Sequence, residues 1–262
     1  MTRSNGKALA SAALLALLQT APALAQTASA GPSPAAATLD ADAEAALNRM
    51  GAALRGMNSF EVRSDATSET VYDGTHKIMS RASTTYSVQM PDRMTVDMQT
   101  DTSHRRIYYN GKVMSVVGMK IGKYVTFPVS GTVSQVLERA SSDFGIDFPL
   151  QDLFRWGGPS SDVVRPTSGF RVGGSTIDGV AVSQYAFRQP GVDFQIWLED
   201  GVQALPRKLV ITDMENPAQP QYVATFTWNR TPTFAADAFT FTPRPGDKLV
   251  DFGTAKAAQA VK

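Results

Sequence analysis

The spacing of apolar residues along the chain changes near residue 58. Before this point, apolar residues recur three and four positions apart and predict one amphipathic helix over residues 40–55, with Asp40 as its N-cap: Ala43, Leu47, Met50 and Leu54. From Ser59 onward, apolar and polar residues alternate. Such alternation is typical of strands with one buried face and one wetter face.

Three later segments show the alternation clearly, with apolar residues at Met94, Val96 and Met98, at Phe194, Ile196 and Leu198, and at Tyr222, Ala224, Phe226 and Trp228. Four dipeptides that tolerate positive φ separate the expected strands: Asp73-Gly74, Asn110-Gly111, Asp178-Gly179 and Asp200-Gly201. The pattern predicts a mainly β (α+β) fold with an antiparallel sheet of about ten strands.

One apolar insert interrupts the strands. Residues 132–140 place Val133, Val136 and Leu137 on one helical face, and residues 150–156 form a second short helical candidate. We expect the insert to pack its apolar face onto the sheet. The N-terminal helix is then expected to cover the convex face or one edge.

The first 25 residues have the pattern of a signal peptide. Arg3 and Lys7 precede an apolar run from Ala8 to Leu18, and Ala23-Leu24-Ala25 supplies small residues for cleavage before Gln26. The alternative is an uncleaved N-terminal anchor. We expect a signal peptide at 1–25, a disordered linker at 26–38, a single domain at 39–253 and a disordered tail at 254–262. The protein is not expected to be an integral membrane protein, because no later segment is long and apolar enough to span a bilayer.

Charge and composition exclude several kinds of chemistry. The chain has 25 basic and 24 acidic residues, so no general electrostatic attraction to nucleic acid is expected. It has no cysteine, which excludes thiol catalysis and cysteine-bound metals. Its two histidines are not in metal-ligand spacing, and no G-x-S-x-G motif occurs. We therefore predict no catalytic centre, no metal and no cofactor, although residues distant in sequence could still converge in space as a triad.

Two clusters of similar residues leave alternatives open. Asp92, Asp97 and Asp101 are either a solvated face or a group of carboxylates. Six of the ten methionines lie between Met79 and Met119. Methionine is flexible and polarizable, so these residues form either an ordinary strand core or a deformable apolar concavity.

Several segments, in the same order along the chain, resemble the periplasmic lipoprotein-carrier (LolA-like) superfamily, and in particular its uncharacterised predicted periplasmic members. They are the opening helix followed by Ser59-Phe60, the segment Met90-Pro91-Asp92-Arg93-Met94, the hairpin Ile107–Lys112, the strand Leu205–Asp213, and Phe239-Thr240-Phe241-Thr242-Pro243 followed by Gly246. The last segment is the most specific.

The resemblance implies an unclosed β-barrel in the periplasm, with a helical lid over a hydrophobic cavity that takes acyl chains. Two features depart from the carrier pattern. Met90 stands where the carrier has an arginine that latches the lid, and the acylated N-terminal cysteine of the membrane-anchored acceptor is missing. Binding of an apolar ligand is therefore expected more firmly than lipoprotein delivery.

We therefore predict a non-enzymatic periplasmic protein that binds a hydrophobic small molecule or acyl chain, from a lipid or a lipidated protein, in a concave apolar cavity. The alternative is an envelope protein-interaction or stress-sensing module on the same fold; an enzyme is a third hypothesis. The expected ligand-binding residues are Met94, Val96, Met98, Val133, Val136, Leu137, Phe144, Phe148, Phe154, Phe194, Ile196 and Leu198.

Overall fold

The computed structural model describes residues 38–144, 156 and 164–251. The expected signal peptide, nearly all of the linker and the C-terminal tail lie outside the described residues. So does the second helical candidate at 150–156, apart from Trp156, which lies in a turn.

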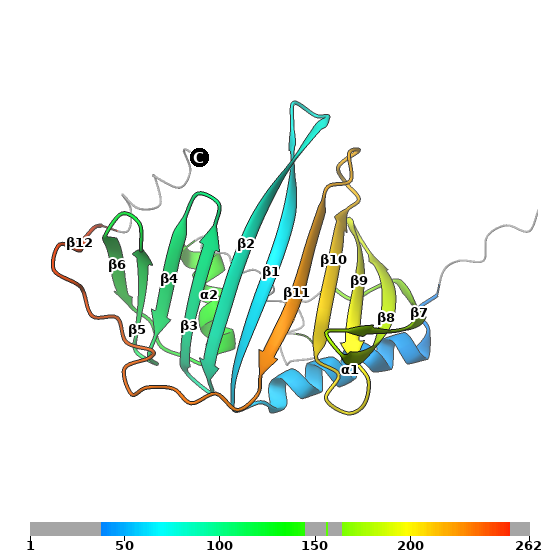
Figure 1. Ribbon diagram of the computed structural model, residues 1–262, viewed down its shortest axis with the longest axis horizontal. Coiled ribbons are helices and arrows are strands. Elements are labelled where there is room, and N and C mark those ends of the chain that lie inside the picture. Colours follow the sequence, from blue (N-terminus) through cyan, green and yellow to red (C-terminus); the bar gives the residue numbers. More distant parts are fainter. Residues whose placement is uncertain (1–37, 145–155, 157–163, 252–262) are drawn as a thin grey trace, which may run out of the picture. The chain divides into compact units, whose positions relative to one another are not determined.

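The described residues form two helices and a mainly antiparallel sheet of twelve strands (Figure 1). The elements are α1 (Ala41–Gly56), β1 (Ser59–Tyr72), β2 (His76–Gln89), β3 (Arg93–Thr100), β4 (His104–Tyr109), β5 (Val113–Gly118), β6 (Lys123–Pro128), α2 (Val133–Phe144), β7 (Ser168–Ile177), β8 (Val180–Gln189), β9 (Val192–Glu199), β10 (Pro206–Asp213), β11 (Gln221–Asn229) and β12 (Lys248–Leu249). The sheet order is β12-β6-β5-β4-β3-β2-β1-β11-β10-β9-β8-β7.

Two antiparallel meanders, β1–β6 and β7–β11, join where β1 pairs with β11. The short β12 adds to β6 in parallel and ends the sheet on that side. The other end is β7, so the sheet is curved but open. This confirms the predicted mainly β, unclosed architecture, with two strands more than the approximate number expected from the sequence.

The glycine-containing dipeptides occupy connections between strands. Asp178 and Gly179, with φ of 49° and 77°, form the two-residue loop between β7 and β8, as expected for a tight hairpin. Asp73-Gly74 and Asn110-Gly111 lie in the β1–β2 and β4–β5 connections. The expectation of an equally tight turn at Asp200-Gly201 is wrong, because residues 200–205 form a longer loop in which Leu205 folds back to accept a hydrogen bond from the Glu199 N–H.

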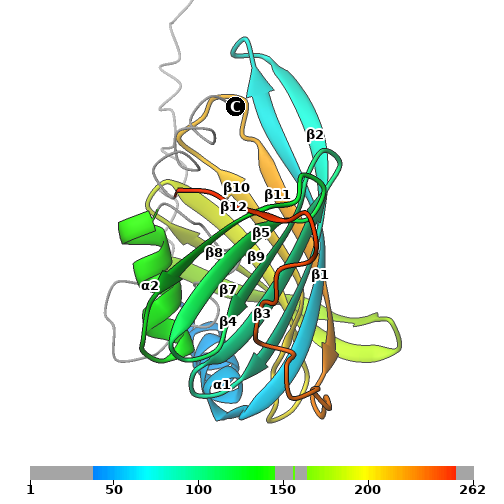
Figure 2. The same cartoon turned by 90° about the vertical axis from the view of Figure 1, so that its left-hand side faces the viewer.

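Both helices lie against the same side of the sheet, which we call the concave face (Figure 2). This is the face that carries Met94 and Val96; the convex face carries Thr95 and Asp97. The expectation that the N-terminal helix covers the convex face is therefore wrong. The expected edge contact is present, because the Asp40 N–H donates to the Gly169 carbonyl of edge strand β7 at 2.9 Å.

Both helices bury the faces that their sequences predict. In α1, all four residues of the apolar stripe are buried: Ala43, Leu47, Met50 and Leu54. Helix α2 begins close to the expected position and continues four residues beyond Ala140, with Val133, Val136 and Leu137 buried. The sequence therefore identified both amphipathic helices, and it left the position of α1 on the sheet unresolved.

Candidate functional site

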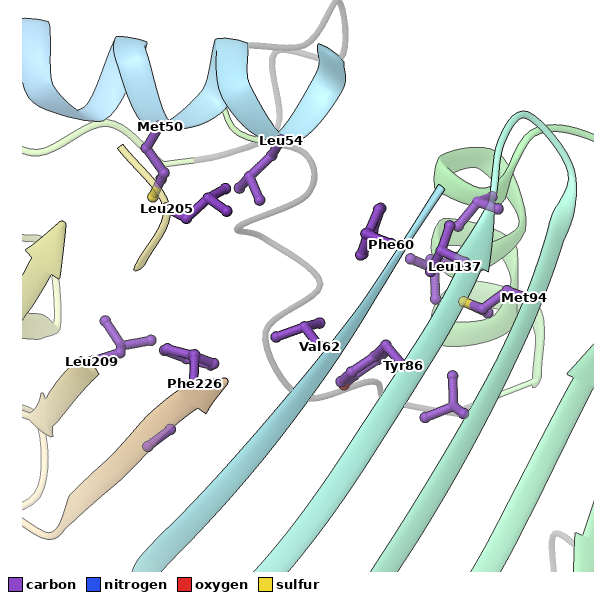
Figure 3. Packing of buried hydrophobic residues seen from close by; sticks show 14 of the residues in the cluster. Met50, Leu54, Phe60, Val62, Tyr86, Met94, Leu137, Leu205, Leu209 and Phe226 are labelled. Carbon is purple, nitrogen blue, oxygen red and sulfur yellow. The ribbon is translucent and has the colours of Figure 1, made fainter. Parts of the chain in front are cut away.

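The concave face is apolar at both ends, and each end is covered by one helix (Figure 3). Under α1, Met50 and Leu54 lie close to Leu205, while Leu209 and Phe226 line the neighbouring strands. These side chains come from the β9–β10 loop, β10 and β11. Burying each of them contributes roughly 1.5–3 kcal/mol, so this end of the face docks the helix firmly.

The second end lies under α2, where Leu137 faces Met94 (Figure 3). Two hydrogen bonds fix the entry to this helix. The Tyr109 hydroxyl donates to the Gly131 carbonyl at 2.6 Å, and the Val133 N–H donates to the Pro91 carbonyl at 2.8 Å. The start of α2 is thus held by β4 and by the β2–β3 turn.

Met90 is the first residue of this turn and packs against the apolar cluster. Its own N–H donates to the Asn58 carbonyl at 2.8 Å. An apolar side chain at this position cannot form the hydrogen bonds that the resemblance assigns to a latch arginine. Among the described contacts, the Tyr109 and Val133 hydrogen bonds hold the base of α2 instead.

Small side chains occupy the concave face between the two ends. Ala66 of β1 pairs with Ala82 of β2 on one side and with Ala224 of β11 on the other. Two residues before Ala66 on β1, Ser64 pairs with Thr84 and Phe226. Protein interiors are close-packed, and large side chains usually fill the centre of such a face. In the row of Ala82, Ala66 and Ala224 the side chains rise little above the backbone, whereas the neighbouring rows carry Phe226 and Tyr86.

Two tyrosines border this central strip. Tyr86 lies on β2 beside Val62, between Phe226 and Met94 (Figure 3). Burial raises the pKa of its phenol well above the usual value, and the nearby Tyr222 adds to the effect. Burial also raises the pKa of Tyr222, and a hydrogen-bonding interaction with the Ser64 hydroxyl partly offsets this rise. Since each group acts electrostatically on the next, the hydroxyls of Ser64, Tyr86 and Tyr222 lie near one another.

Ser64 is the unusual member of this group. Its side chain is 2% exposed. Within the part of the chain that the structure describes, its Oγ has no partner of ordinary hydrogen-bond geometry, so its interaction with Tyr222 is too long or too poorly aligned to satisfy it. Buried polar side-chain atoms are generally hydrogen-bonded. Leaving one without a partner costs about 1–3 kcal/mol, so this hydroxyl needs an explanation.

The structure brings most of the sequence-predicted ligand-binding residues together. Seven are buried members of the apolar cluster: Met94, Val96, Val133, Val136, Leu137, Ile196 and Leu198. Phe194 is partly buried and packs against the cluster. Met98 is partly exposed on the same face, opposite Thr84. Phe148, Phe154 and the side chain of Phe144 lie outside the described residues. Whether these residues bind a ligand remains a prediction.

Sequence reasoning missed Ser64, Tyr86 and Tyr222 as a group. Tyr222 was recognised as the start of an alternating strand, but serine and tyrosine positions carried no ligand signal of their own. Their proximity depends on the pairing of β1 with both β2 and β11. The available hint was that Ser64 has the parity of the apolar residues Val62 and Ala66, which predicts burial of its hydroxyl.

The aspartates and the methionines that cluster in the sequence do not lie together in the fold. Asp97 accepts hydrogen bonds from His104, at 2.7 Å, and from Arg106, whereas Asp101 accepts one from the Arg81 backbone N–H. No group of three or more metal-ligating side chains occurs among the described residues. Met94 and Met114 are core residues, whereas Met79 is exposed on the convex side of the β1–β2 hairpin. The six methionines therefore do not form one continuous surface.

No helix within residues 38–144 and 164–251 is both long and apolar enough to cross a bilayer.

Comparison with solved structures finds similar folds at low sequence identity. MucB is 16% identical, with a TM-score of 0.42, over 78% of this chain and 64% of that one, which is less than two thirds of its length. LprF from Mycobacterium bovis is 15% identical, with a TM-score of 0.45, over 77% and 99% of the two chains. A LolA superfamily protein from Nitrosomonas europaea is 10% identical, with a TM-score of 0.36, over 76% and 97%.

The sequence matches none of the curated proteins with which it was compared. A family model does match it across residues 43–253, from the third residue of α1 to four residues beyond the end of β12. The match therefore spans the whole sheet, α2 and all but the first two residues of α1. The chain belongs to the DUF2092 family of predicted periplasmic proteins.

Proposed function

We propose that the protein binds an apolar ligand, an acyl chain of a lipid or of a lipidated protein, on the concave face of its sheet, without catalysis and in the periplasm. The observation that carries this proposal is the central strip of small side chains, Ala82, Ala66 and Ala224, between two apolar ends. A linear chain lying over this strip would contact apolar side chains along its whole length.

The energetics favour a long, unbranched ligand. Each methylene group transferred from water to an apolar surface contributes about 0.8 kcal/mol. A chain that runs from the α2 end toward the α1 end would meet Met94, then the alanine strip, then Leu209. The LolA-like resemblance of the sequence implies the same class of ligand independently of this geometry.

Native mass spectrometry of protein purified from the periplasm without refolding tests the proposal. We expect the wild-type protein to carry apolar adducts and to bind a fluorescent fatty-acid ester. Met98→Asp places a charge on the partly exposed concave position and should remove both signals while the protein remains folded. Gln99→Asp is the matched control, because the adjacent residue is exposed on the convex face.

A wild-type protein that carries no adduct and binds no apolar probe would refute the acyl-ligand proposal. Equal loss of binding in both variants would also count against it, because the effect would then not depend on the concave face.

A second function, as an envelope protein-interaction module, is favoured by the β1–β2 hairpin. This hairpin extends past the ends of β3 and β11 (Figure 1), since the last pairs of those strands are Thr100 with Ala82 and Tyr222 with Ser68. Beyond them, Tyr72, Ile78 and Met79 are 67%, 53% and 63% exposed. Replacing all three with serine should leave lipid binding unchanged and abolish binding to a protein partner if this function is the correct one.

A further inference from the structure

The buried Ser64 hydroxyl, which has no hydrogen-bond partner of ordinary geometry, lies on the face proposed for the ligand. Ser64 alternates on β1 with Arg63 and Asp65, which form an ion pair of 2.9 Å on the convex face. Its side chain therefore projects to the concave face, toward the region where the acyl chain is proposed to lie. An apolar surface that needed only to fill space would carry alanine or valine at this position.

The neighbours of Ser64 indicate the kind of group that this hydroxyl could bind. Its cross-strand neighbours are Thr84 and Phe226. Those of Tyr86 are Val62 and Val96, and those of Tyr222 are Ser68 and Ile211. None of these residues is basic, so a carboxylate here would have no adjacent cation to offset its loss of hydration. Hydroxyl groups can donate to a neutral acceptor without that cost.

We infer that Ser64, flanked by Tyr222 and Tyr86, donates a hydrogen bond to a neutral oxygen of the bound ligand, and that the site therefore selects esterified acyl lipids over free fatty acids and plain hydrocarbons. This inference rests on the proposed function and specifies it further. It assigns a chemical class to the ligand and gives the buried hydroxyl a partner that is present only in the complex.

The short side chains around Ser64 support this arrangement. Tyr222 lies four residues along β11 from Phe226, the residue opposite Ser64, and the pair of Ala224 with Ala66 stands midway between them. Side chains two positions apart on a strand share one face, and alanine leaves space above the backbone. The alanine pair thus places no large side chain on this face between Tyr222 and Ser64.

Three pyrene-labelled probes of equal chain length test the inference on the full protein: a hydrocarbon, the methyl ester and the free acid. We expect the wild-type protein to bind the ester about three- to tenfold more tightly than the hydrocarbon, the range of one net hydrogen bond, and more tightly than the acid at neutral pH. Ser64→Ala should remove this preference by weakening ester binding alone. Tyr222→Phe should reduce it.

Ser115→Ala is the matched control. Ser115 is 6% exposed, lies on the convex face, and its Oγ hydrogen-bonds to Thr126 Oγ1 at 2.9 Å. This variant should keep the preference for the ester. It should also lower the melting temperature of the unliganded protein, whereas Ser64→Ala should raise it by a few degrees, because it removes a buried hydroxyl without a partner.

The outcomes separate the two proposals. If no probe binds, the proposed function fails and the ester site fails with it. If the hydrocarbon, ester and acid bind equally to the wild-type protein, the acyl site stands and the ester site is refuted. A fall in melting temperature for Ser64→Ala as large as that for Ser115→Ala would also refute it, because Ser64 would then have a partner within the protein.

Discussion

The two faces of the sheet differ in how their polar side chains are hydrogen-bonded, and three consecutive residues of β1 show the contrast. On the convex face, Arg63 and Asp65 satisfy each other through two hydrogen bonds of 2.9 and 3.0 Å. Between them in sequence, Ser64 points to the concave face, and its Oγ has no hydrogen-bond partner of ordinary geometry among the described residues. Adjacent residues of β1 therefore carry polar groups that bond to each other on the convex face and an unsatisfied hydroxyl on the concave face.

The convex face is completed by the chain itself. After β11, the segment 230–250 passes over β3–β6, where Thr95 donates a hydrogen bond to the Ala238 carbonyl at 2.7 Å. The Phe241 ring packs against Tyr108 and Tyr124, with centroid distances of 5.6 and 4.9 Å. The segment then ends as β12 beside β6. The convex face of these strands is consequently covered by a fixed partner from the same chain.

The concave face is covered by helices at its two ends, and its centre has small side chains and a buried hydroxyl. The two faces therefore differ in how their polar groups are satisfied: by ion pairs and by the covering segment on the convex side, and incompletely at Ser64 on the concave side. The predictions that follow test this contrast by placing changes on one face or the other.

The largest effect should come from a charge buried on the concave face. Val96 is 0% exposed, and Val96→Asp would bury a carboxylate among Tyr86, Ile107 and other apolar neighbours. We expect a loss of at least about 3 kcal/mol in the free energy of unfolding, measured by urea denaturation. Met98→Asp, two residues along the same face but partly exposed, should cost much less. Equal losses in the two variants would show that Met98 is as fully enclosed as Val96.

A smaller effect should come from the covering segment on the convex face. Phe241→Ala removes both ring contacts with Tyr108 and Tyr124, and each aromatic pair contributes about 0.5–1.5 kcal/mol beyond its buried area. The free energy of unfolding should fall by about 2 kcal/mol in total, while binding of an apolar probe stays unchanged. Phe241→Leu, which keeps most of the apolar area, should lose less. Loss of probe binding in Phe241→Ala would contradict the assignment of the two faces to different roles.

The sequence predicted well those features that depend on local periodicity. Val96 and Ile196 lie on the buried face because alternation along a strand fixes the face of each residue once its neighbours are known. The stripe of α1 was predicted for the same reason. The position of α1 on the sheet was not predicted, because amphipathicity shows that a helix packs against something but does not show where. Here the pairing of residues 38–40 with Gly169 of β7 sets the position.

Features that depend on distant pairing could not be predicted. The approach of Tyr222 to Ser64 requires β11 to lie beside β1 in one register, and a shift of one residue would turn Tyr222 to the convex face. Likewise, the segment Phe239–Pro243 carried the most specific part of the family resemblance, yet its sequence did not show that Phe241 packs against Tyr108 and Tyr124. The ion pairs of the convex face also depend on register, as between Asp97 and Arg106.

The smallest effect should come from Asp65, the convex neighbour of Ser64. The Arg63 guanidinium holds the pKa of this carboxyl below its usual value, an effect that burial partly offsets and Ser83 reinforces. Because the folded-state pKa is depressed, the stabilisation is fully present above the unfolded value of about 3.9 and is lost as the pH falls through the lower folded value. Both side chains are more than half exposed, so solvent screening limits the contribution to about 0.2–1 kcal/mol.

Asp65→Asn should therefore lower the free energy of unfolding slightly at about pH 7, and the difference from the wild type should disappear near pH 2. Urea denaturation at the two pH values measures it. Ser64→Ala, one residue away, should raise stability by an amount that does not depend on pH, because its hydroxyl does not titrate in this range. Removing a polar group would then change the free energy of unfolding in opposite directions at two adjacent residues of one strand. A loss of stability in both variants would instead mean that the concave hydroxyl is satisfied within the protein, as the convex carboxylate is.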